Sequence, residues 1–423
     1  MARALLKNYL GLEGQGEVTV NNEELFAAFE QVDQAQQVVD EVETDIDSLE
    51  ASSQGLESIV EDLQASLENG GLDTTAAAFA EHAVTAHVQP LGLEGHSIVP
   101  SLESFGGYTG REASTQVSIE GISDTIKKIW AAIKAAVQKA IKAVADFFAK
   151  IFGGIDKVVK KLEDEKKELK KMVNTHEVKP KAEVTIPHSE TLRFNGKLDY
   201  SSVTTGIQRL TGLINKVMSE GKGGGIGAAK GLIENTMDVI EKAKDAKSDE
   251  GLADSLQLLV DGHDLVTKTY EKLETDIVTG DKVYQVVTET DKMPDVTFKL
   301  SSKAQPVKDT EKKQEPYPLP SMVNIVENTI SALKDADKEK DKIKKLNDAR
   351  EKAVKVADKA VEDEDKNAVY NVWEKAKSRA ILKATQYDIA KPIRDLSKTV
   401  FSVGRAVISL SEATKGGYKK KDK

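Results

Sequence analysis

Seven copies of a short glutamate motif hold the residues best suited to chemistry in this chain of 423 residues. Each copy has Gly or Ser, then Leu or Ile, then Glu, then a small or short residue, and all seven begin within the first 120 residues. Three copies lie in or at the end of a turn-rich stretch, where an extended chain can enter the cleft of a protease. These three copies, at Glu94, Glu103 and Glu120, are therefore candidate contacts for an external protease.

The other reactive residue types show no comparable pattern. The chain has no cysteine, which excludes disulfides, thiolate metal sites and cysteine nucleophiles. Its six histidines lack the spacing of a zinc site. The glycine-rich stretch 221–231 lacks the Gly-Lys-Ser/Thr ending of a phosphate-binding loop, and we interpret it as a connector between helices. We therefore predict no catalysis, no cofactor and no metal.

Charge divides the sequence into two opposite parts. Overall, 60 basic and 70 acidic residues give a net charge of −10. Residues 1–120 contain 3 basic and 22 acidic residues, a net −19, which leaves 57 basic and 48 acidic residues, a net +9, in residues 121–423. This asymmetry predicts an acidic arm on a basic body.

A basic amphipathic helix is predicted from Ile122 to Ile155, because apolar residues recur there every three or four positions. Such a helix packs its apolar face on neighbouring helices, and its lysines face water or phosphate groups. A membrane-surface role is a third interpretation, since Trp130 and Phe148 beside lysines suit an interfacial helix. The candidate nucleic-acid contacts are its lysines and those of the basic tail: Lys127, Lys128, Lys134, Lys139, Lys142, Lys150, Lys419, Lys420 and Lys421.

Most of the remaining sequence is also predicted to be helical. Two acidic helices are expected between residues 21 and 68, with a break near Ser52–Gly55, where Glu50, Glu57 and Glu68 are ordinary helix residues. Gly153–Gly154 is expected to interrupt the basic helix before a second charged helix that ends near Val173. Further helices are predicted at 203–219, 228–246, 252–278, 323–361, 368–384 and 392–411.

A small β element completes a mainly α fold. Asn195–Gly196 predicts a β-hairpin between Pro180 and Tyr200, and residues 283–287 and 296–300 are candidate strands. The sequence then divides into these parts: an acidic helical arm (1–88), a flexible linker with cleavage sites (89–120), a basic helical body with the β element (121–300), a proline-rich linker (301–320), a C-terminal helical domain (321–414) and a mobile basic tail (415–423).

Repeated small-x-Glu sites on an acidic arm, followed by a basic helical body, resemble the internal head proteins of giant phiKZ-like tailed phages. The resemblance implies that a phage prohead protease cuts after glutamate and removes a propeptide. It implies Glu13, Glu94, Glu103 and Glu120 as the residues before the cut bonds. It further implies capsid or inner-body proteins as partners, and a virion-interior location after assembly in the host cytoplasm.

Charge makes this function physically coherent. A precursor at −10 binds duplex DNA poorly, whereas the remainder after a cut at Glu120 carries +9 and can bind packaged DNA without sequence preference. Two alternatives stay open. The arm can be a permanent acidic oligomerisation segment of a cytosolic scaffold protein, or the basic helix can belong to an ejected effector that acts on a membrane.

Overall fold

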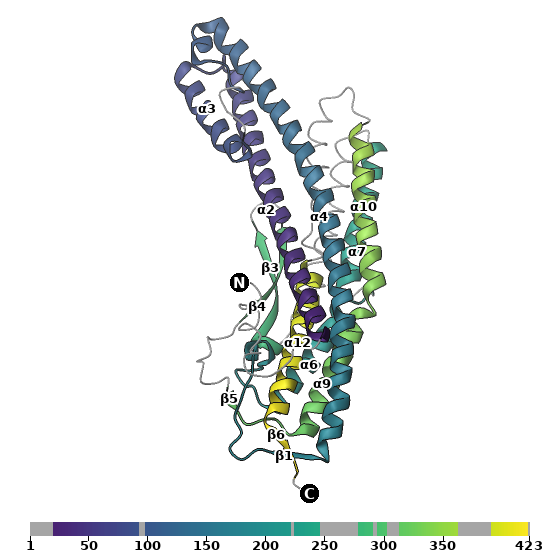
Figure 1. Ribbon diagram of the computed structural model, residues 1–423. Coiled ribbons are helices and arrows are strands. Elements are labelled where there is room, and N and C mark those ends of the chain that lie inside the picture. Colours follow the sequence, from purple (N-terminus) through teal and green to yellow (C-terminus); the bar gives the residue numbers. More distant parts are fainter. Residues whose placement is uncertain are drawn as a thin grey trace. The chain divides into compact units, whose positions relative to one another are not determined.

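The structure is a computed structural model that describes residues 20–92, 98–220, 224–245, 278–290, 294–302, 313–362 and 391–421. These residues are mainly helical, with three small two-stranded sheets, which confirms the predicted fold class (Figure 1). Contacts divide the chain into two compact units. Unit 1 comprises residues 1–36 and 144–423, and unit 2 comprises residues 37–143. No described helix is long and apolar enough to span a membrane.

Helix α2 (Val20–Glu68) is continuous where two acidic helices were predicted. Ser52 and Ser53 are buried, and a side chain at Gly55 would collide with the imidazole of His87 on α3 (Thr74–Val88). The small residues therefore allow α3 to approach α2 closely, and they do not break the helix. Helix α2 ends at Glu68, and Gly70 in the turn after it has a φ of 92°, in the left-handed conformation that glycine adopts without strain.

Helix α4 (Tyr108–Val173) has 66 residues. It starts before the predicted position at Ile122, and it ends at Val173, where the second charged helix was predicted to end. It begins inside the predicted flexible linker, so residues 108–120 are helical, contrary to the prediction. It also continues through Gly153–Gly154, which was predicted to interrupt it. A Cβ at Gly154 would lie 2.7 Å from Cζ of Phe401, whereas nothing lies within 4 Å of a Cβ at Gly153. Gly154 thus serves close packing against a neighbouring helix.

Among the described residues, five longer helices build unit 1 together with the unit 1 parts of α2 and α4. They are α6 (Tyr200–Val217), α7 (Gly225–Asp245), α9 (Leu319–Asp337), α10 (Lys340–Glu362) and α12 (Lys391–Gly416). Helix α9 packs between α6 and α12, and α10 packs on α7 (Figure 1). The segment predicted as a separate C-terminal domain therefore shares a compact unit with the body.

The predicted helix at 323–361 is divided into α9 and α10 by a turn at Lys338–Glu339. Helix α12 confirms the helix predicted at 392–411, and α6 and α7 confirm those predicted at 203–219 and 228–246. The helices predicted at 252–278 and 368–384 lie outside the described residues.

Two of the three sheets join distant parts of unit 1. Strands β3 (Lys282–Thr290) and β4 (Pro294–Ser302) pair antiparallel and confirm the strands predicted there. Strand β2 (Val184–Thr185) pairs with β5 (Lys313–Gln314) inside the predicted proline-rich linker. Strand β1 (His176–Val178) pairs with β6 (Tyr418–Lys420), so the tail predicted to be mobile forms a strand.

The predicted hairpin between 180 and 200 exists as a minimal turn. Asn195 and Gly196 both have positive φ, and the backbones of Phe194 and Lys197 exchange hydrogen bonds of 2.9 and 3.1 Å. This is the two-residue turn that an Asn-Gly pair favours. The extended arms are missing, because β2 pairs with β5 and the residues before the turn form the short helix α5 (Ser189–Leu192).

Candidate functional site

Glu103 lies in the 3-10 helix η3 (Leu102–Phe105), in an irregular part of unit 2. Its side chain is exposed, while Phe105 two residues later is fully buried and anchors the segment. The hydroxyls of Ser101 and Ser104 lie 3.1 Å apart across the turn. The specificity pocket of a protease can therefore reach the glutamate side chain. The buried ring of Phe105 anchors the segment that follows it.

Few interactions hold the backbone around the Glu103–Ser104 bond. The amide of Ser104, which belongs to the bond itself, donates a 2.9 Å hydrogen bond to the carbonyl of Ser101. The carbonyl of Glu103 accepts a 3.1 Å hydrogen bond from the amide of Gly106, and the carbonyl of Ser104 accepts one of 2.9 Å from Oγ of Ser114. A protease binds its substrate as an extended chain, so these are the bonds that cleavage must open. Each contributes about 0.5–1.5 kcal/mol net.

Glu120 has the same motif on a different backbone. It lies within α4, where its exposed carboxylate accepts a 3.0 Å hydrogen bond from Nε2 of Gln116. Ser118 is buried, and a Cβ at Gly121 would lie 2.7 Å from the carbonyl oxygen of Ile98. The small residues of this copy therefore serve helix packing. The predicted extended chain at Glu120 is wrong, because α4 must unwind before a protease can cut there.

The other copies of the motif are divided between helix α2 and residues outside the description. Glu57 is 3% exposed and sits 3.5 Å from Oγ of Ser53, one turn earlier on α2. Its neighbour Leu56 is fully buried, as expected for an ordinary helix position. Glu13 and Glu94 lie outside the described residues.

The lysines predicted on the basic helix are all exposed on α4. These are Lys127, Lys128, Lys134, Lys139, Lys142 and Lys150. Lys127 forms an ion pair of 3.3 Å with Asp124. Of the tail lysines, Lys419 pairs with Glu177 across the β1–β6 sheet at 3.1 Å, and Lys420 and Lys421 are exposed. The tail lysines are therefore held beside the end of α4, since β1 follows it directly.

The continuous helix adds five exposed lysines that the sequence analysis did not select: Lys157, Lys160, Lys167, Lys170 and Lys171. Lys167 and Lys170 form ion pairs with Asp164 and Glu327, which leaves Lys157, Lys160 and Lys171. Together with Lys150 they are spaced by 7, 3 and 11 residues, which places all four on one face of α4 at 3.6 residues per turn. We call these four residues the lysine face. Within the described part of unit 1, none of them has an ion-pair partner. Their spacing across Gly153–Gly154 is the signal that could have revealed them.

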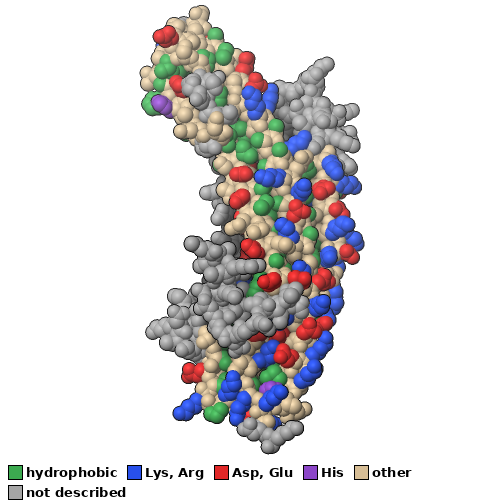
Figure 2. Space-filling model, viewed as in Figure 1, with side chains coloured by type: hydrophobic (Ala, Val, Ile, Leu, Met, Phe, Trp, Pro, Cys, Tyr) green, Lys and Arg blue, Asp and Glu red, His purple; other side chains and the backbone are tan. Residues whose placement is uncertain are grey.

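Three acidic residues of the same helix stretch pair with lysines outside the lysine face. Glu163 pairs with Lys334 at 2.7 Å, Asp164 with Lys167 at 3.1 Å and Glu168 with Lys415 at 2.6 Å. The hydrogen bond and the charge of Lys334 lower the pKa of Glu163. Figure 2 shows Lys and Arg side chains over α4 and α10 with acidic side chains among them. The lysine face therefore keeps its positive charge beside paired carboxylates.

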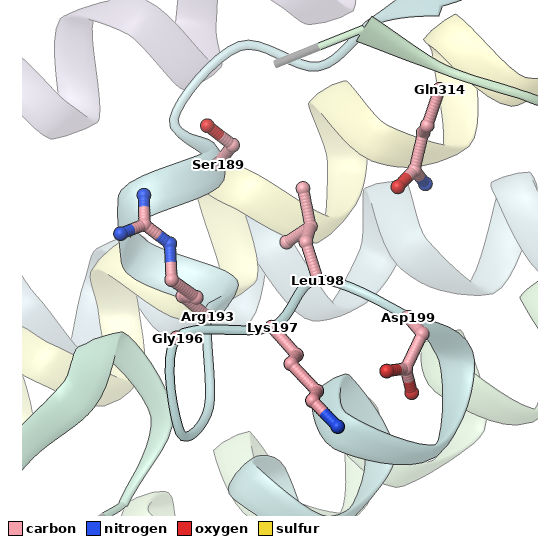
Figure 3. A pocket seen from close by; sticks show the side chains of 7 residues that line it. All are labelled: Ser189, Arg193, Gly196, Lys197, Leu198, Asp199 and Gln314. Carbon is pink, nitrogen blue, oxygen red and sulfur yellow. The ribbon is translucent and has the colours of Figure 1, made fainter. Parts of the chain in front are cut away.

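A cavity of about 370 Å³ lies beside α5 (Figure 3). Arg193 is 7% exposed at its wall, Lys197 and Asp199 follow on the next loop, and Gln314 comes from β5. The backbone amide and the hydroxyl of Ser202 donate hydrogen bonds to the Asp199 carboxylate. The hydrogen bond from the amide is the main cause of the lowered pKa of Asp199. Asp199 caps α6 and its carboxylate also lines the cavity, so the lining combines cationic, anionic and neutral groups. No group of three metal-ligating side chains occurs among the described residues.

Comparison with known proteins gives one match. The family described as phiKZ-like phage internal head proteins matches residues 34–413. The match includes most of α2, the segment around Glu103 and the lysine face. No curated protein matches the chain, and no solved structure does.

Proposed function

Because the chain belongs to the phiKZ-like phage internal head proteins, we propose that it is made as an acidic precursor and cut by the phage prohead protease, chiefly after Glu103. The family makes it a structural protein of the phage head interior, with capsid-related partners. We predict no enzymatic activity. Assembly would begin in the host cytoplasm, before DNA enters the head.

The backbone around Glu103 carries this choice of site. It combines an exposed glutamate, a four-residue 3-10 helix and few backbone hydrogen bonds to break. The bond after Glu120 lies in the interior of a 66-residue helix, and cutting it requires local unfolding of buried neighbours such as Ile119 and Ile122. Although both sites carry the same motif, the difference in backbone structure supports cleavage after Glu103 before cleavage after Glu120.

Cleavage would reverse the sign of the net charge. Residues 1–103 contain 2 basic and 20 acidic residues, so the remainder has 58 basic and 50 acidic residues, a net +8 in place of −10. The lysine face would then contact DNA phosphates through counterion release, with strong salt dependence and little sequence preference.

The cleavage step is tested with the full-length chain and the purified prohead protease. We expect a new N-terminus at Ser104, loss of that cut in Glu103→Gln, and its persistence in the matched variant Glu120→Gln. Peptide mapping of purified heads should show the same N-terminus. Uncut protein after prolonged incubation, or intact residues 20–103 in mature heads, would contradict processing and support a permanent acidic arm.

DNA association is tested separately, with the precursor and the product, here residues 104–423 freed of the cut arm, bound to the same duplex at several salt concentrations. We expect tighter binding by the product, and a reduced salt slope when Lys150, Lys157 and Lys160 are changed to Gln. A matched control changes Lys166, Lys167 and Lys170, which have carboxylate partners. Equal binding by precursor and product would contradict the role of charge.

A further inference from the structure

Residues 25–36 of the acidic arm are packed inside unit 1. Apolar side chains of α2 recur at helical spacing and are almost fully buried: Leu25 (5% exposed), Ala28 (4%), Phe29 (7%), Val32 (1%) and Ala35 (4%). The polar residues between them, such as Glu30 and Gln31, are exposed. This part of α2 therefore buries one continuous face.

Helix α12 provides contacts for that face. The ring centroids of Phe29 and Phe401 lie 4.6 Å apart at 43°, and the guanidinium of Arg405 lies 4.9 Å from the Phe29 centroid. Lys398 forms a 3.3 Å ion pair with Asp33. Lys398, Phe401 and Arg405 are spaced by three and four residues, so one face of α12 presents them all. We call these three residues the α12 face.

We propose that the α12 face is a helix-binding surface whose occupant after processing is the cut arm itself. Residues 25–36 of α2 then stay bound as part of a second polypeptide. The proposal rests on the proposed cleavage after Glu103. None of the contacts to Phe29 or Asp33 involves the Glu103–Ser104 bond, so a cut there leaves them in place.

Charge favours the same occupant. The cut arm carries −18 and the remainder +8, so the two pieces attract each other, and Asp33 lies opposite Lys398 at the contact itself. The apolar contact between the tilted rings of Phe29 and Phe401 adds an attraction that salt does not screen. The charge change that favours DNA would therefore be complete only when the arm has been displaced.

The test separates arm retention from the natural protease. A recognition sequence for a site-specific protease is inserted between Glu103 and Ser104 of the full chain, and the protein is cut after purification. We expect the two pieces to elute together in 0.15 M salt and to give the mass of a one-to-one complex in native mass spectrometry. Immediate separation of the pieces would overturn the proposal, even if the prohead protease cuts after Glu103.

Variants then locate the binding surface. In the cut protein, Phe29→Ala should speed dissociation of the arm at least tenfold, while Glu30→Ala on the exposed side of α2 leaves it unchanged. Equal rates for these two variants would place the retaining contacts elsewhere and overturn the proposal. Thermal melts of the uncut chains check that both variants fold.

A charge exchange provides a second readout. Lys398→Asp should speed dissociation a few-fold, and the added substitution Asp33→Lys should restore the original rate. A merely destabilised α12 would not be rescued by a change on the arm. Loss of the arm with dimerisation of the remainder would assign the α12 face to a second copy and contradict the proposal.

Discussion

Two segments in the proposed cut arm (residues 1–103) and at its boundary differ in how the rest of the protein holds them: residues 25–36 and residues 98–107. Residues 25–36 bury a continuous apolar face and contact Phe401 and Arg405. Residues 98–107 form turns and one short 3-10 helix, with an exposed glutamate. The difference teaches that breaking the chain and releasing the arm are separate events. The first depends on local backbone opening, and the second on a helix contact.

Removing the ring of α12 that contacts Phe29 of the arm should have the largest effect. Phe401 is 2% exposed and contacts Phe29 as well as the backbone at Gly154. We expect Phe401→Ala to lower the free energy of unfolding by about 3–5 kcal/mol, because it leaves a cavity. Denaturant titration of the uncut chain measures this. Phe79→Ala, at a position 72% exposed, is the control and should change stability by less than about 0.5 kcal/mol.

The adjacent glycines of α4 test the packing beneath the same contact. Gly154→Ala should lower stability by about 1–3 kcal/mol, since the new methyl group would overlap the Phe401 ring. Gly153→Ala should raise it by about 0.5–1 kcal/mol, because alanine favours helix and nothing lies near its Cβ. Equal effects of the two substitutions would show that α4 does not pack on α12 at Gly154.

At the other segment, Ser114→Ala should speed cutting. It removes the hydrogen bond to the carbonyl of Ser104 and so eases opening of the segment. A loss of about 1 kcal/mol corresponds to roughly fivefold faster cleavage after Glu103. Ser118→Ala is the matched control, since that hydroxyl bonds within α4 to the carbonyl of Ser114. Initial rates from gel densitometry distinguish the two, and unchanged rates in both would mean that opening is not limiting.

The smallest effect concerns a carboxyl group within unit 1. Burial raises the pKa of Asp337, helped by repulsion from Asp156. The folded protein thus holds that proton more tightly than the unfolded chain, so ionised Asp337 lowers stability, and the loss grows as pH rises from the ordinary pKa through the raised value. We expect Asp337→Asn to stabilise the protein at pH 7 by less than about 1 kcal/mol and less at pH 4. Melts across this range check it, and a pH-independent difference would contradict it.

Local patterns in the sequence predicted the local structure well. The apolar stripe of residues 122–155 marks the buried face of α4, and Asn195–Gly196 forms the expected tight turn. The mainly helical class and the β3–β4 pair follow from the same kind of signal. In each case the period or the turn residue fixes a backbone conformation without reference to any distant partner.

Small residues were misinterpreted because they have two opposite uses. The sequence pattern predicts a helix break at Gly55 and at Gly154, and it includes Gly121 in a cleavage motif. In the structure each of these glycines gives a neighbouring group room to approach a helix. The sequence near a glycine does not say which use applies, since the neighbour lies elsewhere in the chain. For the same reason the motif located Glu103 and Glu120 equally, and the continuity of α4 was needed to rank them.

The pairing of β1 with β6 has a consequence for the order in which parts of the chain fold. It joins residues about 240 positions apart, whereas α4 forms from contacts three or four residues apart. Closing so long a loop costs conformational entropy, and three residue pairs offset little of it. The strand β1 therefore keeps an unpaired edge while the intervening residues are synthesised. We expect this sheet to form late, and amide hydrogens of β6 to exchange before those of α4.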